Sequence, residues 1–236
     1  MKKFLRINRI YLFLVFVGIC QISFSQQKEL DSLLIELKQH PQEDTVRLNM
    51  LNDITFDYCM LDYNKAILTA EEAIQLALKL NNISKLATAY RYKGLGYANM
   101  RKDSAAMDMY NKALQLYEQM QNRNGIANAY HTIGMLYSSG ADYYKALEYE
   151  QKALDISREM NNKIFVARIL NSIGVNYLYL TNYSNALDCY LQTLQISDDI
   201  GDKVGKADAL TNMGLVYNHM KKYKQALAFH QNSLAL

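Results

Sequence analysis

The stretch GMLYSSGADYYKALEYEQKAL, from Gly134 to Leu154, has counterparts along the chain at a spacing of 40 residues. Five sequence positions keep this spacing over four copies. They are Ala87, Ala127, Ala167 and Ala207, Gly94, Gly134, Gly174 and Gly214, Tyr97, Tyr137, Tyr177 and Tyr217, Ala106, Ala146, Ala186 and Ala226, and Leu114, Leu154, Leu194 and Leu234. Such a fixed period is typical of a repeat protein, in which each unit packs mainly on its neighbours.

Each copy contains two blocks of apolar residues at helical spacing. In the first block Ile133, Gly134 and Tyr137 follow the three-and-four step of one helix face, and the block 146–156 does the same. The turn signal SSGAD separates the two blocks. Because Gly134 and Ala146 are small, the two predicted helices can approach each other closely there. Each copy is therefore predicted to be a helix, a tight turn, a second helix and a short loop.

The order of these residues resembles the tetratricopeptide repeat, which has a small residue, then Tyr three, Ala twelve and Ala nineteen positions later. Here the order is present at Gly134, Tyr137, Ala146 and Ala153. The family's usual period is about 34 residues, and the longer copies of this chain have Arg158 where the family has a helix-ending proline. Their length is similar to that of kinesin light chain repeats. The resemblance implies an all-α fold, an α-α superhelix (TPR solenoid) of about five helix-turn-helix repeats.

The repeat register predicts the organisation of the chain. Residues 1–25 are predicted to be a signal peptide, 26–43 a short N-terminal capping helix and 44–236 the repeat array. The predicted repeats are 44–82, 83–122, 123–162, 163–202 and 203–236. The last is expected to be incomplete, because Leu236 stands partway along a second helix. Its uncapped apolar face is expected to fray or to support self-association.

The first 25 residues differ in kind from the rest. Basic residues precede a run of 10 apolar residues, IYLFLVFVGI, from Ile10 to Ile19, and small residues follow. This layout is typical of a secretory signal peptide, cut here after Ser25, and spanning a bilayer would need roughly 18 apolar residues. The chain is therefore expected to be periplasmic or extracellular, and membrane-anchored only if it is a fragment of a longer protein. The alternative is a lipoprotein signal acylated at Cys20, which the bulky Ile19 disfavours.

Charge and cysteine usage exclude several function classes. The predicted signal carries four of the 26 basic residues and none of the 23 acidic ones, which leaves 22 basic residues against 23 acidic. No basic surface for nucleic acid or an anionic membrane is expected. Cys59 and Cys189 are separated by 130 residues, more than three repeats, so no disulfide between them is predicted.

Signals of catalysis, cofactors and metals are sparse. Gly94 and Gly96 form a Gly-x-Gly pair, but no strand precedes it and Gly94 belongs to a repeat position, so phosphate binding is not predicted. The histidines His40, His131, His219 and His230 form no His-x-x-His or Glu-x-x-His pair. The chain is predicted to be no enzyme and to hold no cofactor or metal.

A partner is expected on the concave surface, which in this family is lined by the first helix of each repeat. The predicted partner-binding residues are Arg91, Asn128, His131, Arg168, Asn171, Tyr179, Asp208 and His219. Family members that clamp a C-terminal carboxylate use Lys and Asn where this chain has Arg91 and Leu95, so such a clamp is not expected. A protein or peptide segment held by amide, guanidinium and apolar contacts is predicted. The alternative is that these side chains are merely solvated.

Two functions remain open from the sequence. The first is a non-catalytic, exported scaffold that binds a protein or peptide. The second is a truncated sensor region of a histidine kinase or transcriptional regulator in signal transduction. An export signal followed by DTVRLNMLNDI and long repeats resembles the outer part of such bacterial sensor kinases.

Overall fold

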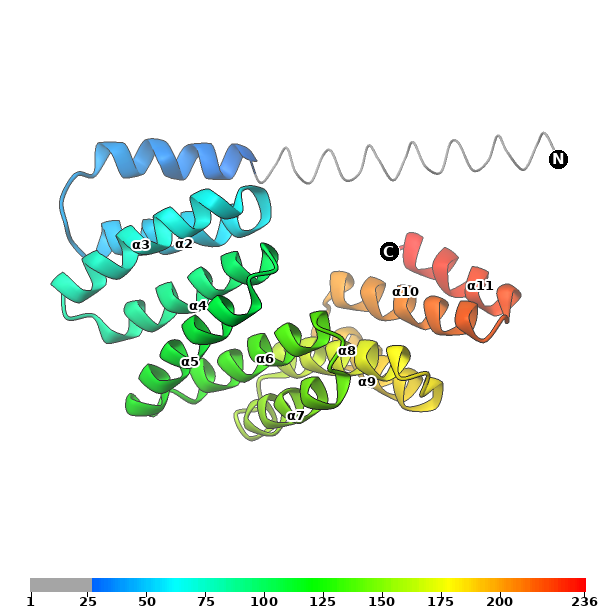
Figure 1. Cartoon of the computed structure of the whole chain (residues 1–236). Helices are drawn as coiled ribbons and strands as arrows, with labels where there is room; N and C mark the ends of the chain where they lie inside the picture. Colours follow the sequence, from blue (N-terminus) through cyan, green and yellow to red (C-terminus); the bar gives the residue numbers. More distant parts are fainter. Residues whose placement is uncertain (1–26) are drawn as a thin grey trace. The chain divides into compact units, whose positions relative to one another are not determined.

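The computed structural model describes residues 27–236, and every regular element in this part of the chain is an α-helix (Figure 1). The predicted signal peptide, residues 1–25, lies outside the described residues. The all-α class is confirmed for the described part of the chain. None of its helices has the length and apolar character required to cross a membrane.

A first helix covers residues 27–39, within the segment predicted as a capping helix. The helices that follow are α2 (Thr45–Leu61), α3 (Tyr63–Lys79), α4 (Ile83–Asn99), α5 (Asp103–Gln119), α6 (Arg123–Ser139), α7 (Tyr143–Glu159), α8 (Lys163–Tyr179), α9 (Tyr183–Ile200), α10 (Lys203–His219) and α11 (Tyr223–Leu234). A single residue, Asp62, separates α2 from α3, so this turn is shorter than the others.

The turns from α3 onward use one backbone device. Each contains one residue with left-handed φ, between 51° and 72°. These residues are Asn81, Arg101, Gln121, Ala141, Asn161, Thr181, Gly201 and Lys221. The residue after each caps the next helix in most turns; the Asn122 side chain, for example, accepts a hydrogen bond of 3.0 Å from the Gly125 N–H. A left-handed residue ends one helix and an Asn or Asp side chain starts the next, which fixes the tight reversal.

The chain divides into two compact units. One extends to Met100 and the other runs from Arg101 to Leu236. The boundary falls inside the predicted repeat 83–122, between α4 and α5.

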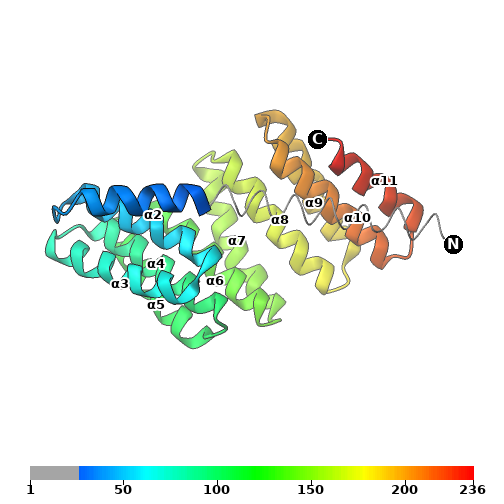
Figure 2. The same ribbon diagram turned by 90° about the horizontal axis from the view of Figure 1, so that it is seen from above.

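In the first unit α2, α3 and α4 pack against one another (Figure 2). A hydrogen bond of 2.7 Å from Asn99 Nδ2 to the Cys59 carbonyl ties α4 to α2. Gly96 of α4 lies close to α3, because a Cβ added there would come within 3.3 Å of Ile67 Cγ1. Small residues thus permit close helix packing in this unit.

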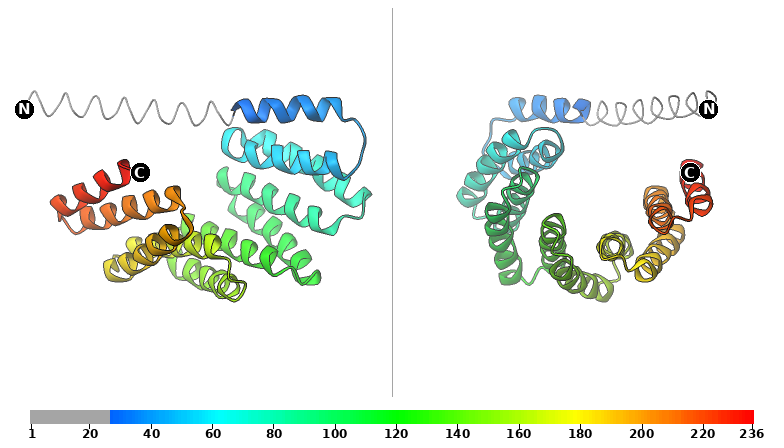
Figure 3. Two further views of the ribbon diagram at one scale, coloured as in Figure 1. Left: turned by 180° about the vertical axis from the view of Figure 1, so that it is seen from behind. Right: turned by 45° about the vertical axis from the view of Figure 1, so that its right-hand side comes forward.

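In the second unit each helix from α5 to α11 packs against the next, and α8 also contacts α6 and α10 (Figure 3). The recurring glycine of each first helix faces one side chain of the second helix. The facing pairs are Gly134 with Glu150, Gly174 with Tyr190, and Gly214 with His230. An added Cβ would lie 2.9 Å or less from these side chains. The prediction that glycine serves close helix approach is confirmed here.

The core of the second unit is built from successive apolar clusters. One centres on α8 and includes Phe165, Ile169 and Cys189. The next includes Tyr190 and Val216, and Tyr177 packs against both clusters. Tyr177 therefore fills the space between neighbouring repeats of this unit.

Cys59 and Cys189 are free, buried thiols. Burial raises the pKa of Cys59 to about 12 and that of Cys189 to about 11. Both act as small packing residues in their own units.

Candidate functional site

The first helices of the second unit, α6, α8 and α10, carry a polar side chain at matching positions, half-buried in α6 and exposed in α8 and α10. These side chains are Asn128, Arg168 and Asp208. Buried residues flank the first two on the helix; Ala127 and Ala129, for example, are 1% and 0% exposed. Asp208 lies between the half-buried Ala207 and the buried Ala209. The three polar side chains must therefore point away from the core, because a helix cannot turn neighbouring residues to the same face.

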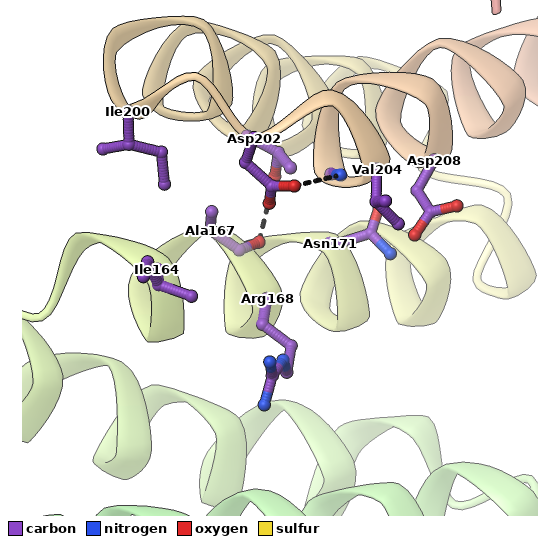
Figure 4. A pocket seen from close by; sticks show the side chains of 10 residues that line it. Ile164, Ala167, Arg168, Asn171, Ile200, Asp202, Val204 and Asp208 are labelled. Carbon is purple, nitrogen blue, oxygen red and sulfur yellow. Dashed lines mark hydrogen bonds between the residues drawn. The ribbon is translucent and has the colours of Figure 1, made fainter. Parts of the chain in front are cut away.

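Arg168, Asn171 and Asp208 line one cavity of about 510 Å³ (Figure 4). We call it the α8–α10 cavity, because α8, the end of α9 and the start of α10 enclose it. Apolar side chains such as Val204, which is 72% exposed, complete its walls. Three of the eight sequence-predicted residues thus come together here.

The α8–α10 cavity has two carboxylates, Asp202 and Asp208, and one guanidinium, Arg168, on its lining. Asp202 caps α10 by accepting a hydrogen bond of 3.0 Å from the Gly205 N–H. Burial, and then the negative charge of Asp202, raise the pKa of Asp208 above its usual value. The Arg168 guanidinium extends away from both carboxylates in Figure 4, and it lies 5.9 Å from the Phe165 ring. Arg168 is in none of the ion pairs formed between described residues, so its charge is available to a ligand.

A second cavity, of about 490 Å³, lies between α6, α7 and α8. We call it the α6–α8 cavity. Asn171 lines both cavities, and Tyr179 lines the second. The Tyr179 ring is 60% exposed and stacks on the Tyr143 ring with centroids 5.2 Å apart. Asn171 is held in place because its Oδ1 accepts a hydrogen bond of 2.9 Å from Asn212 Nδ2. Asn171 therefore joins the two cavities along α8.

His131 departs from its expected open position. It is only 6% exposed, and its Nδ1 lies 2.7 Å from Oε2 of Glu150, which is fully buried. The edge of the imidazole also packs on Phe165. Burial raises the pKa of Glu150, while the contact with His131 acts in the opposite direction. The expectation that His131 faces a partner is corrected, because this side chain points into the α6–α7 interface.

The remaining predicted residues lie apart from the two cavities. Asn128 donates a hydrogen bond of 2.9 Å to the Asn124 carbonyl on its own helix. His219 is exposed near the end of α10, and its ring centroid lies 6.4 Å from that of Tyr183. In the first unit the Arg91 guanidinium stacks over the Tyr92 ring at 4.4 Å.

Two buried polar residues of the α6–α8 cavity, Glu150 and Asn176, are not among the residues predicted from the sequence. A signal was available at both. At the positions that match Glu150, the other copies have Tyr110, Tyr190 and His230, and at those that match Asn176 they have Gly96, Leu136 and Val216. Glu150 is thus a carboxylate at a position where the other repeats have a ring, and Asn176 is an amide where they have a small or apolar residue. These two differences distinguish the α6–α8 cavity chemically from the matching places in the other repeats.

The first unit has its own cavity, of about 750 Å³, beside α2 and α3. Part of its charged lining is paired, since Lys79 contacts Glu43 and Glu71 contacts Lys93 of α4. None of the eight predicted residues lines it. Among residues 27–236, no cluster of three or more His, Cys, Asp or Glu side chains could hold a metal ion.

Comparison with known families identifies the repeat. A family model described as tetratricopeptide repeat matches residues 165–236, and another with the same description matches residues 126–163. No curated protein matches the chain.

Solved structures share the fold at low sequence identity. BtubC (BKLC) from P. vanneervenii is 18% identical with a TM-score of 0.71, and the match covers 90% of each chain. A Rap protein complexed with competence and sporulation factor is 15% identical with a TM-score of 0.66, covering 90% of this chain and 72% of that one. A signal transduction ATPase with a tetratricopeptide repeat sensor, from Pyrococcus horikoshii, is 16% identical with a TM-score of 0.69, covering 87% and 33%.

Proposed function

Because the chain belongs to the tetratricopeptide repeat family, we propose that it is a non-catalytic scaffold whose second unit binds an extended peptide segment of a partner. One observation carries the proposal: Asn171 lines both cavities, so they form a continuous polar track with apolar walls. Amide side chains can donate to and accept from the backbone of an extended peptide. The Rap protein structure supports this reading, since a related fold is complexed there with another factor.

The size of the track suits a short peptide. Arg168 and Tyr179 mark its ends on α8, about 16 Å apart at 1.5 Å per helical residue. An extended chain rises about 3.3 Å per residue, so about five peptide residues fill the track. Arg168 at one end would bind backbone carbonyls or a carboxylate, and the exposed Tyr179 ring at the other would pack on an apolar or planar group.

The first prediction concerns Asn171. Replacing it by Leu keeps the branched shape but removes both hydrogen-bonding groups, and we expect peptide binding to weaken about tenfold. The measurement uses the full chain, peptides selected from a displayed random library, and fluorescence polarisation. Gln195→Leu is the control, because Gln195 is exposed on α9 and bonds only to Asp199. Equal affinities of the two variants would remove Asn171 from the site, and a chain that selects no peptide would refute the function.

We also propose that residues 1–25 export the chain, on the strength of their basic flank and apolar run. Expression with a secretion-competent bacterial host is expected to yield a processed protein that begins at Gln26. N-terminal sequencing of the secreted material tests this. An unprocessed protein confined to the cytoplasm would contradict it, and acylation at Cys20 would favour the lipoprotein signal instead.

A further inference from the structure

The α6–α8 cavity contains two buried polar atoms that no other group satisfies. Glu150 Oε1 and Asn176 Nδ2 have no hydrogen-bond partner among the described residues, although both side chains line the cavity. Glu150 is 0% and Asn176 1% exposed. Leaving such a buried atom without a partner is unfavourable, so two in one cavity point to a ligand that pairs with them.

Both side chains are anchored through their other polar atom. Glu150 Oε2 lies 2.7 Å from His131 Nδ1, and Asn176 Oδ1 accepts a hydrogen bond of 2.6 Å from the Ser138 hydroxyl. These contacts fix which atoms remain unsatisfied. The cavity therefore offers one acceptor, Glu150 Oε1, and one donor, Asn176 Nδ2.

Repeat packing does not account for this pair. In the next repeat the position of Glu150 is taken by Tyr190, whose ring packs against Gly174, and in the last repeat by His230 against Gly214. The glycine contact is therefore satisfied equally well by a ring. Glu150 keeps the contact, to Gly134, and adds a carboxylate that the packing does not need.

We propose that the α6–α8 cavity is the subsite for one side chain of the bound peptide, and that this side chain carries a carboxamide, as Gln and Asn do. This assignment rests on the peptide-binding function proposed above. A carboxamide N–H donates to Glu150 Oε1 while its carbonyl accepts from Asn176 Nδ2, so both buried groups are satisfied. The apolar side chains of Met135 and Val175, which line the same cavity, suit the methylene stem of Gln.

Other side chains satisfy the cavity less well. An ammonium or guanidinium group has only donors and leaves Asn176 Nδ2 unpaired. A carboxylate has only acceptors and meets the negative charge of Glu150. An alkyl group leaves both polar atoms unpaired, and a site built for hydrogen bonding discriminates strongly against such analogues.

The test begins with the 236-residue chain and a displayed library of random short peptides. Sequencing of the bound fraction is expected to reveal one position enriched in Gln or Asn. In synthetic copies of a selected peptide, changing that residue to Met, Glu or Lys is expected to weaken binding by about tenfold or more.

The matched variant is the double substitution His131→Asn with Glu150→Tyr. It installs the pair that the next repeat already has at the same positions, Asn171 and Tyr190, so the fold accommodates it. The variant is expected to bind the Gln and Met peptides with affinities that differ by less than about twofold. Asn176→Val, which copies Val216, removes the donor and the Ser138 hydrogen bond but leaves Glu150 in place, and it is expected to lose the same preference.

Three outcomes would overturn the carboxamide subsite while leaving the proposed function intact. They are selection of Lys or Arg at that position, peptide binding with no preferred residue, and an unchanged Gln preference in the double variant. A library that yields no bound peptide would overturn both proposals.

Discussion

Replacement of Gly174 by Val is expected to lower the free energy of unfolding by about 3 kcal/mol, because the new side chain has no room. A Cβ at Gly174 would lie 2.5 Å from Tyr190 Cε1. The Tyr190 ring is 0% exposed and is packed between α8 and α10, so it cannot swing into solvent. Either the ring leaves its place or α8 and α9 separate. Urea unfolding monitored by circular dichroism measures this decrease in the free energy of unfolding.

The control for Gly174 is the same substitution at Gly140. Gly140 is exposed at the end of α6, has φ −84°, and an added Cβ there meets nothing closer than 3.5 Å. Its replacement by Val is expected to change the free energy of unfolding by less than about 1 kcal/mol. If the two variants were equally stable, close helix approach at the recurring glycine would not explain its presence.

Replacement of His131 by Leu is expected to destabilise the protein by about 3 kcal/mol at pH 7, because it leaves the buried Glu150 carboxylate without its partner. The loss should depend on pH. Without His131 the remaining effect on Glu150 is burial, which raises its pKa in the folded state above the unfolded value of 4.5. A raised carboxyl pKa contributes stability that is complete below pH 4.5 and is lost as the pH rises through the folded-state pKa.

The melting temperature of His131→Leu is therefore expected to approach that of the unmodified chain as the pH is lowered from 7 towards 5. Differential scanning calorimetry over this range measures it. Replacing both residues by Leu removes the unpaired carboxylate and is expected to restore most of the stability. If His131→Leu were as stable as the original chain at pH 7, or if its loss of stability did not change with pH, the contact between His131 and Glu150 would not contribute to stability.

The packing of the repeat was predictable because residue size decides it. Gly174 has space for no side chain opposite Tyr190, and Ala186 is 0% exposed, so the same small residues must return in every copy. The exposed positions Arg168 and Asp208 were predictable for a related reason. Arg168 lies between two buried residues and Asp208 between a half-buried and a buried one, and a helix then turns the residue between them outward.

The direction of His131 could not be predicted from the period alone. Its position lies three residues after Asn128, which turns the side chain about 60° away from that column on a helix of 3.6 residues per turn. In the structure this rotation brings the His131 side chain into contact with Glu150. Thr211, at the matching position of α10, contacts Ser233 of α11 in the same way. His131 and Thr211 therefore face the second helix of their own repeat, whereas Asn171, at the matching position of α8, is bonded to Asn212 of α10 and lines both cavities.

The left-handed turn residues return every 20 positions, from Asn81 to Lys221, whereas the side chains of the core return every 40. The backbone turns are thus the same after every helix, whereas the core side chains differ between the first and the second helix of each repeat. Excision of one helix with its turn would rejoin the chain at equivalent left-handed residues without strain. It would, however, bring a glycine-bearing helix against another of the same kind, with no ring to fill the gap. During evolution such a chain can lengthen or shorten only in even numbers of helices.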